Sequence, residues 1–78
     1  LFPAALMGPA YVRALKDVLP KQVGVWAVGG TGADTVGEWL AAGCEGIGVG
    51  GALYRPGDDA GTVRDRALEL VAAWKRTQ

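Results

Sequence analysis

Two glycine-bearing turns are the parts of this sequence whose residue types and spacing point to chemistry. The turns, residues 27–30 and 48–51, each close a run of strand-forming residues and precede a helical pattern. A phosphate needs backbone N–H donors with no side chain in the way, so glycine between a strand and a helix favours an anion. Paired turns after the last two strands of a (β/α)8 barrel are the usual place for such a site. We therefore interpret the turns as two halves of a phosphate site.

The elements around the turns alternate between helix and strand. Pro9 after Gly8 predicts a helix start, and Pro20 ends that helix. Residues 23–28 are apolar on both faces, which is the pattern of a parallel strand covered on both sides. Strand alternating with helix predicts parallel pairing through right-handed crossovers.

Two further helices follow the strand. Thr31 and Asp34 predict the N-terminal cap of a helix that Gly43 ends, and Asp58 or Asp59 is expected to cap the last helix. Trp39 and Trp74 fall on the inner stripes of these helices, so they are expected to pack, as is Trp26 in the first strand.

A short second strand is predicted around Ile47 and Val49. The glycines interleaved with them leave one side of this strand almost bare, which permits close packing or the close approach of a ligand. Cys44, just before the strand, is expected to be a buried small hydrophobe rather than a reactive thiol.

Composition excludes several classes of function. Eight Lys and Arg balance eight Asp and Glu, so no net charge recruits nucleic acid or a membrane surface. No apolar run approaches the ~20 residues of a membrane span, and no secretory signal pattern is present. With no histidine and a single cysteine, the sequence offers no metal cluster, Ser-His pair or internal disulfide. We expect a cytoplasmic protein without a metal or cofactor.

Length adds an expectation about domain organisation. A complete barrel takes about 250 residues, whereas this chain has 78 and begins without methionine. We therefore expect the C-terminal portion of a larger domain, with a small independent domain as the alternative. Half of the residues are hydrophobic, so much apolar surface is expected to face partners outside these residues.

An ordered set of segments resembles the KDPG/KDPGal aldolases. The segments are residues 1–4, 8–15, 27–30, 41–50 and 53–57. The Ala-Val-Gly-Gly turn and the Leu-Tyr-Arg triplet are similar to the 2-dehydro-3-deoxy-6-phosphogalactonate enzymes, whereas the phosphogluconate enzymes usually carry Pro-Thr-Gly-Gly at the former.

The resemblance implies an α/β fold in which residues 1–78 are the C-terminal portion of a single TIM (β/α)8 barrel domain. They would supply the end of strand 6, helix 6, strand 7, helix 7, strand 8 and helix 8. It also implies a class I aldolase that cleaves 2-keto-3-deoxy-6-phosphogalactonate to pyruvate and glyceraldehyde 3-phosphate through a lysine Schiff base, while a glutamate moves protons. The family further suggests a homotrimer.

The resemblance carries binding roles onto six positions. Phe2 would pack near the pyruvyl part of the substrate or fill the barrel, and Pro3 would shape the exit of its strand. The phosphate-binding positions are Gly29, Gly30, Gly50 and Gly51. A tight turn without a ligand is the alternative for the first pair. Gly51 stands where relatives commonly have serine, so one hydrogen bond to phosphate is lost unless backbone or water replaces it.

The resemblance leaves the catalytic residues outside these positions. It places the lysine immediately before the first residue and the glutamate on an early strand of the barrel. Lysines within the chain, and the glutamates considered for the missing roles, are expected to be solvated surface charges; they are Lys16, Lys21, Lys75, Glu38 and Glu45. We therefore expect no catalytic residue among the 78.

Two other functions remain open. The chain could come from a different phosphate-binding barrel enzyme, such as a thiamine-phosphate synthase or an isomerase, that shares only the glycine turns. It could also be a stand-alone, non-catalytic half-barrel module. The ordered segments favour the aldolase, and the intact mass of the purified protein discriminates the module.

Overall fold

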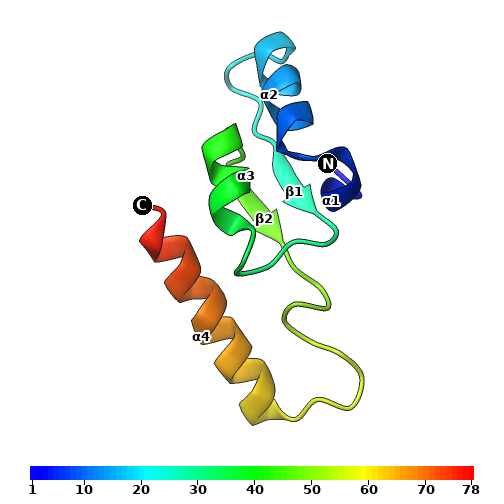
Figure 1. Cartoon of the computed structure of the whole chain (residues 1–78), viewed down its shortest axis with the longest axis vertical. Coiled ribbons are helices and arrows are strands. Elements are labelled where there is room, and N and C mark those ends of the chain that lie inside the picture. Colours follow the sequence, from blue (N-terminus) through cyan, green and yellow to red (C-terminus); the bar gives the residue numbers. More distant parts are fainter.

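The computed structural model describes residues 1–78 as an α/β arrangement (Figure 1). Its elements are α1 (Ala4–Met7), α2 (Pro9–Val18), β1 (Trp26–Val28), α3 (Val36–Ala42), β2 (Gly46–Gly48) and α4 (Ala60–Arg76). The strands pair in parallel, with Ala27 opposite Ile47. The predicted alternation of helix and strand and the parallel pairing are therefore confirmed.

The first residue extends this sheet on the other edge of β1. The amino group of Leu1 donates to the carbonyl of Trp26 at 2.9 Å, and the N–H of Val28 donates to the carbonyl of Leu1 at 3.0 Å. Bonds to residues on either side of Ala27 follow the slanted pattern of a parallel ladder. The chain thus places Leu1, β1 and β2 side by side, in that order.

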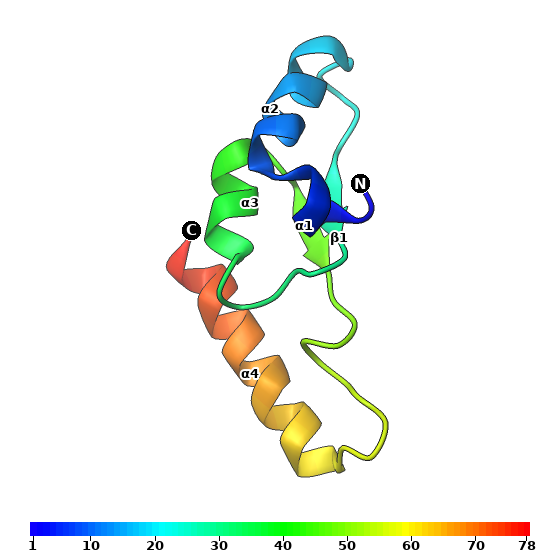
Figure 2. The ribbon, with the colours of Figure 1, turned by 45° about the vertical axis from the view of Figure 1, so that its right-hand side comes forward.

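Helices cover only one face of these strands. Ala27 and the neighbouring Val25 are buried under the helices, whereas Trp26 is 56% exposed and Val28 is 41% exposed. Figure 2 shows α3 and α4 on one side of the strands. The expectation that Trp26 packs is wrong within this chain, because nothing in it covers the second face of the strand. The open face agrees with the expectation that apolar surface faces partners outside these residues. The apolar pattern of β1 therefore indicates a layer that these residues do not provide.

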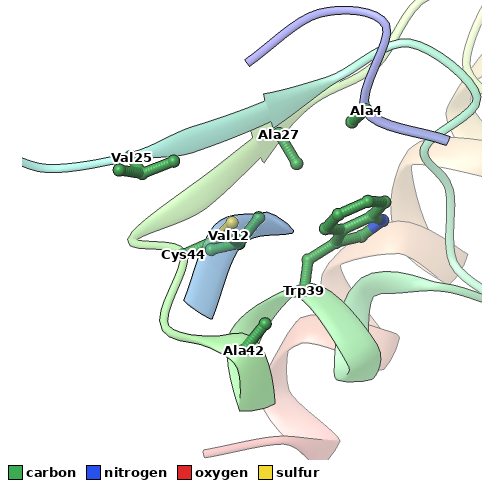
Figure 3. Close-up of a cluster of buried hydrophobic side chains, with 7 residues drawn as sticks. All are labelled: Ala4, Val12, Val25, Ala27, Trp39, Ala42 and Cys44. Atoms are coloured by element: carbon green, nitrogen blue, oxygen red, sulfur yellow. The ribbon is translucent and has the colours of Figure 1, made fainter. Parts of the chain in front are cut away.

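The core lies between the strands and the helices (Figure 3). Its seven buried members are Ala4, Val12, Val25, Ala27, Trp39, Ala42 and Cys44. Trp39 is 3% exposed and is the largest of them, so its predicted packing is confirmed. Burial also raises the pKa of the Cys44 thiol, which fits its predicted role as a small hydrophobe.

Three local predictions differ from the structure. Residues 4–7, for which the sequence predicts no element, form the one-turn helix α1, and β1 begins at Trp26 rather than at residue 23. Thr31 does not cap α3, whose N-cap is Thr35 without a side-chain cap bond. The Thr31 hydroxyl donates instead to the Gly48 carbonyl on β2. The pairing of β1 with β2 brings this carbonyl within reach of the residue that follows the first turn.

Helix α4 is the least enclosed element. Asp59 caps it by accepting from the N–H of Thr62 at 2.8 Å, as predicted, but only Ala73 of this helix is buried. An apolar hollow remains between α4 and the strands, lined by Val36, Ile47, Val49, Leu70, Val71 and Trp74. No helix of the chain has the length and apolar character to cross a bilayer.

Candidate functional site

The two glycine turns meet at the carboxyl ends of β1 and β2 and form one hollow, which we call the glycine hollow. Its lining consists of Phe2, Val28, Gly29, Gly30, Thr31, Gly50, Gly51 and Ala52. Five of the eight lining residues are binding positions expected from the sequence, and Val28, Thr31 and Ala52 are not among those positions.

The fold itself requires the glycines of the first turn. Gly29 and Gly30 have φ angles of 101° and 69°, a region that residues with a side chain rarely adopt. A Cβ on Gly29 would come within 2.9 Å of the Phe2 ring, and one on Gly30 within 2.5 Å of the Ala5 Cβ. Local packing is thus a sufficient reason for both glycines.

The glycines of the second turn have no such reason. Neither Gly50 nor Gly51 has a positive φ. A Cβ at either position would meet nothing within 4 Å. Because both residues line the glycine hollow, a side chain there would occupy space that a bound molecule could use.

The hollow presents a set of backbone donors without partners in the chain. None of the N–H groups at residues 29–31 and 50–52 donates to a backbone acceptor, and no side chain accepts from them. Unpaired N–H groups that line one concavity suit an oxyanion, since each can donate to it without breaking a hydrogen bond within the chain.

The helix ends contribute less than the sequence suggested. Helix α3 begins at Val36 and α4 at Ala60, so neither follows its glycine turn directly. Helix α3 has only seven residues, so the partial positive charge at its N-terminus is small. The hollow therefore relies on turn N–H groups rather than on a helix dipole.

Thr31 holds the two turns together. Its side chain is buried, and its hydroxyl donates to the carbonyl of Gly48. This bond links the segment after β1 to the end of β2, directly before the second turn. A threonine next to a glycine turn is the sequence signal for this role, although its spacing from Asp34 also fits a helix cap, which the structure does not form.

The two residues predicted near the substrate lie at different places. Phe2 is 72% exposed, lines the hollow and lies against Gly29. Pro3 is exposed and also lies against Gly29, but it is not part of the lining. The structure thus brings Phe2 and the four glycines together in one hollow, whereas Pro3 contacts the first turn from outside the hollow.

The lysines lie away from the hollow. Lys16 donates to both carboxylate oxygens of Glu45, at 2.7 and 3.0 Å, and Val25 N–H donates to the same carboxylate at 2.6 Å. Glu45 directly precedes β2, so this pair lies at the opposite end of the strands from the hollow. Lys16 and Glu45 are therefore charges at the surface away from the hollow, as expected, but they form an ion pair with each other. Lys21 is exposed before β1, and Lys75 lies on α4.

Metal chemistry finds no donors here. No group of three or more His, Cys, Asp or Glu side chains is placed to hold a metal ion. The chemical groups that the hollow offers are amide N–H donors, one hydroxyl already engaged, and the aromatic ring of Phe2.

Comparisons with known proteins agree with this geometry. No family model matches the chain. Over 75 residues it is 40% identical to the 2-dehydro-3-deoxy-6-phosphogalactonate aldolase of Escherichia coli (strain K12), covering 96% of this chain and 37% of the relative. It is 40% identical over 73 residues to a probable 2-dehydro-3-deoxy-6-phosphogalactonate aldolase of Rhizobium meliloti (strain 1021), covering 94% of this chain and 34% of that relative. The chain thus spans little more than a third of the length of these relatives.

Solved structures give the same result. The chain matches a structure described as native KDPGal with a TM-score of 0.95 and 39% identity, over 97% of this chain and 37% of that one. It also matches a cube-shaped, highly porous cage designed by fusing symmetric oligomeric domains, with a TM-score of 0.97 and 40% identity over 100% of this chain and 29% of that one. The resemblance to the 2-dehydro-3-deoxy-6-phosphogalactonate aldolases is thereby confirmed for nearly the whole chain.

Proposed function

We propose that these residues form the phosphate-binding part of a 2-keto-3-deoxy-6-phosphogalactonate aldolase, as the C-terminal portion of its (β/α)8 barrel. The observation that carries the proposal is the glycine hollow, where the N–H groups of residues 29–31 and 50–52 have no acceptor in the chain. The 40% identity to two aldolases supports the choice of substrate.

The reaction we propose is that of a class I aldolase. A lysine amine would attack the substrate ketone and expel water, and the resulting iminium would accept the electrons of the breaking carbon–carbon bond. As that bond breaks, a base takes the proton of the neighbouring hydroxyl group, and this fragment leaves as glyceraldehyde 3-phosphate. Protonation of the remaining enamine gives the iminium of pyruvate, and water hydrolyses this iminium to pyruvate and the free lysine amine. No cofactor takes part in this sequence of steps.

The lysine nucleophile would come from another part of the full-length polypeptide. Lys16 is engaged by Glu45 at the far end of the strands, and neither Lys21 nor Lys75 lines the glycine hollow. The role of residues 1–78 would be to hold the phosphate, with Phe2 beside the reacting part of the substrate. A homo-oligomer, trimeric by family resemblance, and a cytoplasmic location complete the proposal.

Pyruvate release tests the function. The full-length polypeptide should release pyruvate from 2-keto-3-deoxy-6-phosphogalactonate and form a borohydride-trapped adduct with pyruvate. Lys16→Arg, Lys21→Arg and Lys75→Arg variants should form the adduct as the unchanged protein does. Absence of pyruvate release would overturn the proposal, and an adduct on one of these three lysines would overturn the assignment of roles.

A different phosphate-binding barrel enzyme is the competing function. The glycine hollow alone fits such an enzyme equally well, because its donors recognise only the phosphate. Turnover of an unrelated phosphorylated substrate without pyruvate release would favour it. The ordered resemblance over nearly the whole chain, reflected in the match to the two aldolases, favours the aldolase.

A further inference from the structure

The segment after β2 carries an arginine cluster that contacts the second glycine turn. Residues 49–59 form a long loop between β2 and α4 (Figure 1). The Arg55 Nε donates to the carbonyl of Gly51 at 3.0 Å. The carbonyl of Gly50 accepts from the N–H groups of Leu53 and Tyr54, both at 2.9 Å.

These bonds fix two peptide planes of the glycine hollow. The peptides after Gly50 and Gly51 are trans, and in a planar trans peptide the N–H points opposite to the C=O. Holding the Gly50 carbonyl therefore directs the N–H of Gly51, and holding the Gly51 carbonyl directs the N–H of Ala52. Both N–H groups lie on the side away from the turn's own bonds, and neither has an acceptor in the chain.

A second layer holds Arg55 in turn. The carboxylate of Asp58 accepts from the backbone N–H of Arg55 at 2.7 Å, and the Asp58 N–H donates to the Arg55 carbonyl at 3.0 Å. Arg66 of α4 forms an ion pair with Asp58 and reaches the Leu53 carbonyl at 3.5 Å. The exposed fractions of the Arg66 and Asp58 side chains are 25% and 17%, so this pair is partly shielded from water.

The charge state of Asp58 suits this arrangement. The backbone N–H of Arg55 and then the Arg66 guanidinium hold the pKa of Asp58 below its usual value. The carboxylate is therefore charged at neutral pH, and a charged acceptor makes the stronger hydrogen bond.

We propose that Arg55 and Arg66 are positioning residues that orient the Gly51 and Ala52 N–H groups toward a bound phosphate, an inference that rests on the proposed function. Neither arginine lines the glycine hollow, so each acts through the backbone of the turn. Glycine at position 51 makes these hydrogen bonds necessary, because glycine can adopt many backbone conformations and does not by itself fix the direction of the neighbouring N–H groups.

Methionine substitutions in the full-length polypeptide test the inference. Arg66→Met keeps the length of the side chain and removes its bonds to Asp58 and Leu53. Arg64→Met is the control, because it removes the same charge from the same helix. The Arg64 side chain is 74% exposed, and its ion pair is with the exposed Asp65 at 3.6 Å. The measured quantities are the inhibition constant of inorganic phosphate, and KM and kcat for the phosphorylated substrate and its non-phosphorylated analogue.

The arginine variants should differ in how strongly they bind phosphate. Arg66→Met and Arg55→Met should each raise the phosphate inhibition constant and KM for the phosphorylated substrate about tenfold, the effect of one lost charged hydrogen bond. Their kcat, and all constants for the analogue, should stay within about twofold of the unchanged protein, as should every constant of Arg64→Met.

Three results would overturn the inference. Arg66→Met could behave like Arg64→Met, or it could lose activity equally on both substrates, which would mean a structural role only. If the unchanged protein neither binds inorganic phosphate nor prefers the phosphorylated substrate, the proposed function fails with it. That result is recognised from the unchanged protein alone, so the two failures are distinguishable.

Discussion

The hydroxyl of Thr31 donates to the carbonyl of Gly48, and this bond links the two halves of the glycine hollow in addition to the pairing of β1 with β2. Thr31 follows the first turn, and Gly48 is the last residue of β2 and the first residue of the second turn. The relative position of the two sets of N–H donors therefore depends on a buried threonine as well as on the strand pairing.

A Thr31→Val substitution tests this link. Valine fills the same space without the hydroxyl, so the Gly48 carbonyl loses a buried donor, and the free energy of unfolding of the full-length polypeptide should fall by about 1 kcal/mol. Phosphate affinity should fall as well, because the turns lose their common anchor. Denaturant unfolding and phosphate inhibition measure the two effects. Thr31→Ser keeps the hydroxyl and should retain most of the affinity; if it is as weak as valine, the bond is not the cause.

Substitutions of Gly51 separate ligand space from packing space. Because a Cβ there meets nothing within 4 Å, Gly51→Ser should fold normally and lower KM for the phosphorylated substrate about threefold by adding a donor. Gly51→Val should raise that KM about tenfold or more by filling the hollow, with the non-phosphorylated analogue little affected.

Gly30→Val is the matched comparison for these variants. Its side chain would strike Ala5 and require an unfavourable φ, so it should reduce stability and activity on both substrates. An equal loss on both substrates for Gly51→Val would show that position 51 is also a packing position, contrary to our assignment.

The Lys16–Glu45 pair predicts a pH dependence of stability. The hydrogen bond from Lys16, followed by that from the Val25 N–H, lowers the pKa of Glu45. A carboxyl whose pKa is lower in the folded state stabilises the fold above its unfolded pKa, and this stabilisation is lost as the pH falls through the folded value. The Tm of the full-length polypeptide should therefore fall more steeply below about pH 4 than that of Glu45→Gln.

Calorimetry between about pH 6 and pH 3 measures this difference. Glu38→Gln is the control, because Glu38 is an exposed carboxylate on α3 for which no ion pair is found. Parallel pH profiles for the unchanged protein and Glu45→Gln would show that the pair does not contribute.

The isolated 78 residues should not form a stable monomer. Only 12 of 78 residues are buried, and the radius of gyration of 13.3 Å exceeds the roughly 11.5 Å of a compact domain of this length. The open face at Trp26 and Val28 and the apolar hollow under α4 need cover. Sedimentation and thermal melts should show aggregated, oligomeric or molten material. A monomer that melts cooperatively at low concentration would instead support the stand-alone module.

Patterns that depend on a residue's own conformation were readable from the sequence. Pro9 begins α2, Gly43 ends α3 in a left-handed conformation, and Asp59 caps α4, as expected. These signals act within one turn of the chain, and at these three positions no distant partner overrides them.

Features that depend on partners were not readable. The exposure of Trp26 depends on whether a second layer covers β1, and the bond from Thr31 depends on where β2 ends. Likewise, Gly29 and Gly51 look alike in the sequence, and only the φ angle of Gly29 and the position of Phe2 show that the fold requires the first glycine. The resemblance indicated which glycines line the hollow. The structure shows in addition that local packing requires the glycines of the first turn and not those of the second.

Amide resonances of the full-length polypeptide test the central claim most directly. Titration with inorganic phosphate, followed by ¹H–¹⁵N correlation spectra, should produce saturable shifts at the N–H groups of residues 29–31 and 50–52, which have no acceptor in the chain. The largest shifts should fall on Gly51 and Ala52, and the phosphorylated substrate should compete for the same site. Saturable shifts confined to arginine or lysine side chains, with these six amides unchanged, would contradict the assignment of the glycine hollow as a phosphate site.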